Sequence, residues 1–242
     1  MTGRLAQASR RTPLSGSAFI RLLAGLNDAA APASQDAFAT GMSRWFDWTD
    51  AISLSAALDS PAEAGIGASA AAVRADEREV ARVRSALLKT LVQAGAGTRR
   101  PARAEPAAAD PGPDDFAPHR ERYLAGQRAM ETNIAPLRRR VRSTLAGASP
   151  AMARLAAVDA VMEQVVGERE RVLLATVATR LGQRFETLRA LRETPDDPDT
   201  PPRPAGWPET FRQEMQDVLL AELDFRMQPV EGLLEALRRH TD

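Results

Sequence analysis

Residues 150–193 read PAMARLAAVDAVMEQVVGERERVLLATVATRLGQRFETLRALRE, and after the opening proline this run holds no helix breaker stronger than glycine. Ser149 before Pro150 is typical of a helix start, because a capping hydroxyl precedes a proline at the first helical position. A helix of this length extends for ~60 Å at ~1.5 Å per residue. The run therefore predicts an all-α protein with an elongated body.

Apolar side chains recur along this run at the three- and four-residue spacing of a coiled-coil seam. The predicted seam consists of Leu155, Val158, Met162 and Val165 and then, after a shift of phase, of Leu173, Val177, Leu181, Phe185 and Leu188. Arg169 interrupts it. A charged residue in a seam marks either the end of a bundle that faces water or a polar lock in an oligomer, and the first arrangement is the commoner one.

Two more long helices are expected around this one. Residues 116–146 align Met130, Ile134, Leu137, Val141 and Leu145, and Pro136 is expected to kink or divide the helix. Residues 209–239 align Phe211, Met215, Leu219, Leu223, Met227, Val230, Leu234 and Leu237, with a kink expected at Pro229. With a loop over 193–208, residues 116–242 are predicted to form an antiparallel three-helix bundle or coiled-coil hairpin.

The N-terminal half carries shorter helical patterns, over about 16–27, 34–46, 50–59 and 71–93. The last of these aligns Val80, Val83, Leu87, Leu88 and Leu91. Residues 95–115 contain four prolines and no large apolar residue, which is typical of a flexible linker. We therefore expect an N-terminal helical domain over 1–94, a linker over 95–115 and the C-terminal bundle over 116–242.

The composition excludes several classes of protein. The chain has no cysteine, so disulfides, zinc–thiolate sites, iron–sulfur clusters and a cysteine nucleophile are ruled out. No apolar run approaches the ~20 residues of a membrane span, and Arg21 interrupts what would be the apolar part of a signal peptide. We therefore expect a cytoplasmic protein with no transmembrane segment.

No motif predicts an enzyme, a cofactor or a metal. Residues 65–70 match the G-x-G-x-x-A dinucleotide pattern, but no predicted strand precedes them. His119 and His240 lie near the two ends of the predicted bundle, which could bring them together, but neither has a carboxylate partner spaced on one helical face. We therefore expect no catalytic residue, no metal ligand and no cofactor.

The segment Trp45-Phe46-Asp47-Trp48 holds three of the eleven aromatic residues of the chain. One interpretation is the core of the N-terminal helices, because indole rings bury a large area. The other is a protein-binding hot spot, where tryptophan is enriched. The scarcity of aromatics favours the core, and Trp45, Phe46 and Trp48 remain candidate partner-binding residues.

The densest basic run is Arg138, Arg139, Arg140 and Arg142. Consecutive residues of a helix point ~100° apart around its circumference, so these arginines do not line one phosphate-binding stripe on an unbroken helix. The chain also carries 32 basic and 32 acidic residues, whereas nucleic-acid-binding domains are basic overall. Nucleic-acid binding through this candidate basic patch is therefore the alternative function.

Three segments carry a family resemblance: LSGSAFIRLL at 14–23, WFDWTDAISL at 45–54 and ELDFRMQPV at 222–230. They resemble an uncharacterised proteobacterial family that is classified only as a domain of unknown function. The resemblance brings no catalytic residue with it. It implies a link to the cell envelope, because genes of that family lie near those of proton-channel-type and OmpA-like envelope proteins.

These observations favour a non-enzymatic helical scaffold or accessory protein-interaction subunit, linked to a cell-envelope assembly. The long apolar seam suits an intramolecular bundle or a dimer equally well, so a homo-oligomer stays open.

Overall fold

The computed structural model describes residues 18–26, 48–59, 67–95, 115–193 and 206–241. They form six α-helices and no strand: α1 (Ala18–Leu26), α3 (Trp48–Asp59), α4 (Ala70–Gly95), α5 (Ala117–Ala146), α6 (Pro150–Glu193) and α7 (Trp207–Thr241). The predicted all-α class is therefore confirmed. The helix predicted over 34–46 and nearly all of the predicted linker lie outside the described residues.

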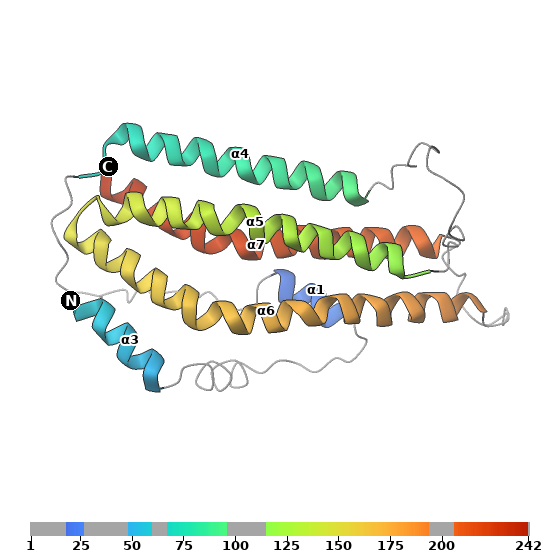
Figure 1. The fold of residues 1–242 in the computed structure, drawn as a ribbon. Coiled ribbons are helices and arrows are strands. Elements are labelled where there is room, and N and C mark those ends of the chain that lie inside the picture. Colours follow the sequence, from blue (N-terminus) through green and yellow to red (C-terminus); the bar gives the residue numbers. More distant parts are fainter. Residues whose placement is uncertain (1–17, 27–47, 60–66, 96–114, 194–205, 242) are drawn as a thin grey trace, which may run out of the picture.

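The four long helices run alternately in opposite directions along the molecule (Figure 1). Each packs against the next in the chain, α4 also packs against α7, and α5 and α7 meet across the middle of the bundle. The expected three-helix bundle over 116–242 is thus too small, because α4, from the predicted N-terminal domain, is a fourth helix of the same bundle.

Among the described helices, none combines the length and the hydrophobicity that a membrane span requires.

The predicted apolar stripes of α5 and α7 form the centre of the core. Every residue predicted in those two stripes is buried, from Met130 to Leu145 on α5 and from Phe211 to Leu237 on α7. On α4 the buried residues include Val80, Val83, Leu87 and Leu91. These side chains belong to one continuous apolar cluster with α6, so burial of the facing stripes is the main force that holds the four helices together.

The predicted helix start at Ser149-Pro150 is confirmed, because the Ser149 hydroxyl accepts a hydrogen bond from the Met152 N–H at 3.3 Å. The preceding turn also anchors α4, since the Gly67 N–H donates to the Gly147 carbonyl at 3.1 Å. Gly67 has φ of +87°, a conformation that favours glycine. Pro136 lies inside one continuous helix, so it does not divide α5.

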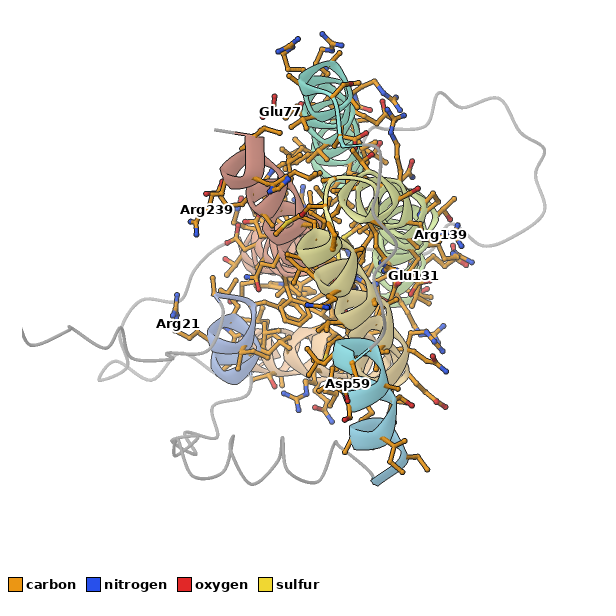
Figure 2. The ribbon with its side chains drawn as sticks, turned by 90° about the vertical axis from the view of Figure 1, so that its left-hand side faces the viewer. Arg21, Asp59, Glu77, Glu131, Arg139 and Arg239 are labelled. Carbon is orange, nitrogen blue, oxygen red and sulfur yellow. The ribbon has the colours of Figure 1, made fainter. Side chains whose placement is uncertain are left out.

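Ion pairs at the surface join α4 to its neighbours. Arg84 pairs with Asp224, at 2.6 Å, and with Glu231 on α7. Arg238 of α7 pairs with Glu77 of α4 at 2.6 Å. Figure 2 shows Glu77 at the edge of α4. Because these groups are partly exposed, they orient α4 more than they stabilise it.

A polar network lies inside the bundle. Glu222 is fully buried and accepts hydrogen bonds from the Tyr123 hydroxyl and from Gln127 Nε2 (3.1 Å), both on α5. Arg226, one turn further along α7, forms an ion pair with Glu222 at 2.8 Å. Burial raises the pKa of Tyr123, and the charge of Glu222 raises it further. The buried Glu222 carboxylate therefore has two hydrogen-bond donors on α5 and a counter-ion on α7. These contacts fix the register of α5 against α7.

Candidate protein-interaction site

Residues 157–173 of α6 are unusual because none of them is buried. The stretch lies between Ala156 and Leu174, which are 3% and 4% exposed, and it carries five valines and one methionine. The predicted seam is therefore wrong here: Val158, Met162 and Val165 are only partly covered, and Leu173 is 50% exposed while Leu174 is in the core. We call residues 157–173 the half-covered stretch.

One side of this stretch faces α3. Among the described helices, α3 packs only against α6. Thr49, Asp50 and Ser53 of α3 line a groove of about 700 Å³, which we call the α3–α6 groove. Its other wall is formed by residues of the half-covered stretch, namely Val161, Gln164, Val165, Glu168, Arg169, Val172 and Leu173.

The apolar side chains around the α3–α6 groove are unusually exposed. Val172 is 65% exposed, and Ile52 on α3 is 54% exposed. Of the nine large apolar residues that are exposed in the described part of the chain, six lie on α3 or α6. Two of these six, Val172 and Leu173, lie together in the wall of the groove, and exposed apolar residues that lie together mark a protein-binding site more than scattered single residues do.

Arg169 gives the α3–α6 groove its chemical character. Its side chain lines the groove from near the middle of the 44-residue helix. Its Nη1 atom is shielded from solvent and has no hydrogen-bond partner in the described part of the chain. The residue as a whole is partly exposed and makes no ion pair with any described residue, so the groove suits an occupant that brings a carboxylate or carbonyl oxygen.

The opposite side of the half-covered stretch borders a second groove, of about 520 Å³, between α5, α6 and α7. Met162, Val166 and Glu170 line it from α6, and Phe225 and Arg226 line it from α7. Burial raises the pKa of Glu170, and the positive charges of Arg226 and Arg138 partly oppose that rise. This groove is lined by both signs of charge, so it defines no ligand class.

The aromatic residues proposed for partner binding are placed only in part. Trp45 and Phe46 lie outside the described residues. Trp48 is the first residue of α3, and its side chain also lies outside the described part. The two residues that follow it, Thr49 and Asp50, line the α3–α6 groove. A role of Trp45, Phe46 and Trp48 in binding stays a prediction.

The predicted basic patch is largely neutralised inside the protein. Arg138 and Arg142 of α5 both pair with Asp159 and Glu163 of α6, with Asp159 at 2.6 and 2.8 Å. Arg140 points to the other side of α5 and pairs with Asp76 of α4 at 2.7 Å. The fourth residue, Arg139, points away from the bundle (Figure 2). The four arginines therefore form no common surface, and three of them connect helices.

The two histidines lie at opposite ends of the bundle. His119, near the start of α5, stacks edge-on against Phe211 near the start of α7, with ring centroids 5.2 Å apart. His240 lies in the last turn of α7, where it shares a shallow hollow with Met152 near the start of α6. The expectation that the fold could bring them together is thus wrong. The described residues also contain no group of three potential metal-ligating side chains.

We expect protonation of His119 to destabilise the fold. Burial among Phe185 and Phe211 lowers the pKa of His119 below its usual 6.5, and the charges of Arg122 and Arg212 lower it further. The unfolded chain therefore binds this proton more readily, so stability falls as the pH drops below about 6.5. The urea midpoint should decrease between pH 7.5 and 5.5. The decrease should be smaller in His119→Gln but unchanged in the exposed His240→Gln control.

The residues of the α3–α6 groove were not identified from the sequence as a site. Val161, Val165 and Leu173 were assigned to a buried seam or left unassigned, because helical spacing does not show which face a bundle covers. Arg169 was the available signal, since a charge in an apolar seam requires an explanation.

The comparisons with known proteins identify a family without a function. The family model described as "Protein of unknown function (DUF3348)" matches residues 5–239. No curated protein and no solved structure gives a significant match.

Proposed function

Because the chain belongs to the DUF3348 family of proteins of unknown function, we propose its role from its surface: it is a non-enzymatic helical scaffold or accessory subunit. It acts by binding a helix of a protein partner in the α3–α6 groove. The observation that carries the proposal is the half-covered stretch, where 17 consecutive residues of a bundle helix include no buried one. A cytoplasmic location and a link to a bacterial cell-envelope assembly are part of the proposal. The location rests on the sequence, which has no long apolar run, and the envelope link rests on the family resemblance.

The shape of the groove supports a helical occupant. Its two walls are α3 and α6, and an amphipathic helix laid between them would cover Val165, Val172 and Leu173. Helix-in-groove recognition uses apolar side chains at three- and four-residue spacing, which is the spacing that α6 presents. Each large apolar side chain moved from water into such an interface stabilises it by roughly 1.5–3 kcal/mol.

The charges of the groove define the partner further. Arg169 lacks an acceptor for its shielded Nη1 within the described residues. A carboxylate between two apolar residues of the partner helix would form an ion pair with the Arg169 side chain from the groove side. The proposed partner segment is therefore an amphipathic helix with an acidic residue in its apolar face.

We expect a photo-crosslinking residue at position 172 to capture a protein helix in host cells, because Val172 is the most exposed large apolar side chain of the groove. Mass spectrometry of the captured peptide should find an acidic residue flanked by apolar residues at helical spacing. Arg169→Glu in the same chain should reduce the crosslink at least about tenfold, since it places like charges together.

The matched control places the crosslinker at position 92, because Val92 on α4 is also exposed, at 43%, but lies outside both grooves. Equal capture from positions 92 and 172, or capture at 172 that does not respond to Arg169→Glu, would contradict the proposed role of the groove.

A further inference from the structure

We propose that the occupant of the α3–α6 groove is the half-covered stretch of a second copy of this chain, paired antiparallel about a two-fold axis near Glu168 and Arg169. This inference rests on the proposed function, since it names the helix that the groove binds. A two-fold dimer is the commonest oligomer, and its interface must be complementary to itself. The argument uses the spacing of α6, the position of Arg169 and the charges on either side of it.

The spacing of α6 is that of a coiled coil on its outer face. From residue 155 a strict heptad repeat runs through Leu155, Val158, Met162, Val165, Arg169, Val172 and Thr176. The core follows a different track from Leu174 onward, through Val177, Leu181 and Phe185. A seven-residue repeat drifts by ~20° per heptad relative to a straight helix. The heptad residues that line the α3–α6 groove, Val165, Arg169 and Val172, therefore lie outside the core of one chain and form the contact face for another.

The position of Arg169 selects between the two explanations for a charge in the seam. Near the middle of a 44-residue helix, Arg169 is not at a bundle end that faces water. The remaining explanation is a polar lock, in which a charged seam residue fixes the register of an oligomer. Arg169 lines the groove and makes no ion pair with any described residue, which fits this explanation because such a residue is paired only when the other helix is present.

The charges around the proposed axis complement one another. Glu168 is exposed and makes no ion pair with any described residue. With the axis between residues 168 and 169, antiparallel pairing places Glu168 of each copy beside Arg169 of the other. The same register sets Val165 against Val172, so two ion pairs lie between two apolar layers. The apolar layers exclude water from the ion pairs, which strengthens them.

A charge exchange tests the pairing. Wild-type protein should sediment at about twice the 26.1 kDa of one chain. Arg169→Glu or Glu168→Arg alone should weaken the dimer at least about tenfold, because each places like charges across the axis. The double variant Glu168→Arg/Arg169→Glu restores opposite charges in both copies at once, and its dissociation constant should return to within about threefold of wild type. Circular dichroism confirms that each variant is folded.

Disulfide crosslinking tests the register independently, because the chain has no cysteine of its own. Val165→Cys/Val172→Cys should form covalent dimers on mild oxidation. The two positions lie ~10.5 Å apart within one helix, beyond the ~7 Å limit between Cα atoms, so they do not close on themselves. Each single-cysteine variant is the matched control and should remain uncrosslinked, since each position then faces a valine.

The outcomes separate this inference from the proposed function. A monomer at concentrations up to about 100 µM, far above the dissociation constant of a stable interface, overturns the dimer. So does a double charge variant that stays as weak as the single ones. If position 172 still captures another protein in an Arg169-dependent manner, the proposed function stands with a different helix in the groove. If position 172 captures neither that protein nor a second copy, both proposals fail.

Discussion

Replacing Arg226 with methionine is expected to lower the free energy of unfolding by about 3–5 kcal/mol. Arg226 is 10% exposed and pairs with Glu222, which is not exposed at all. Methionine keeps an unbranched apolar stem but removes the guanidinium and its charge, so the Glu222 carboxylate remains in the core with only the neutral donors Tyr123 and Gln127. A buried charge without its counter-ion is among the costliest defects that one substitution introduces. Urea unfolding followed by circular dichroism measures the loss.

Two further variants separate charge from packing in this network. Adding Glu222→Gln to Arg226→Met removes the second charge and leaves an amide oxygen for the Tyr123 hydroxyl, so at least half of the lost stability should return. Arg238→Met breaks the exposed pair with Glu77 and should cost less than about 1 kcal/mol. If the core and surface variants lose the same stability, the buried network is not important to the fold.

Truncation of Phe211 to alanine is expected to cost a further, separate 3–5 kcal/mol or so. The ring is fully buried at the end of the bundle where α5 and α7 begin. Its centroid lies 5.1 Å from that of Phe185 on α6 and 6.1 Å from that of Phe116, which precedes α5. Alanine would leave a cavity at the junction of three helices, and their neighbouring rings are too rigid to fill it.

The size of the cavity provides the control for this second prediction. Phe211→Leu retains most of the volume and should lose less than half as much stability as Phe211→Ala. The urea m-value should be the same for both variants, because neither changes the surface exposed on unfolding. Equal losses for leucine and alanine would mean that the aromatic contacts, and not the filled volume, stabilise this end of the bundle.

The sequence predicts α7 well because this helix lies at the centre of the bundle. It packs against α1, α4, α5 and α6, so a wide apolar stripe is covered, and every predicted position is buried. The first half of α6 lies at the edge and has fewer neighbours. Helical spacing there still identifies a helix, but it does not indicate which residues are covered, and Leu155 and Leu173 were wrongly expected in the core.

Three features depend on contacts between residues distant in sequence, and helical spacing does not show them. The composition of 95–115 indicates a linker but not whether the helices on its two sides pack together. The pairing of Arg84 with Asp224 becomes evident only in the structure. Glu222 likewise has the appearance of a surface residue until Tyr123, 99 residues earlier, is found to donate to it. The α3–α6 groove also depends on a contact between distant residues, because Arg169 lines a groove only when α3 packs against α6.

The arrangement of α7 has a consequence for how the protein is made. Among the described helices α7 contacts all but α3, yet it is the last to leave the ribosome. The α5–α6 hairpin is local and forms early, because short loops close at little entropic cost. The apolar faces of α4 and α5 remain uncovered until α7, which has 35 residues, has emerged. A nascent chain is therefore exposed to aggregation and to chaperone binding until α7 has been synthesised.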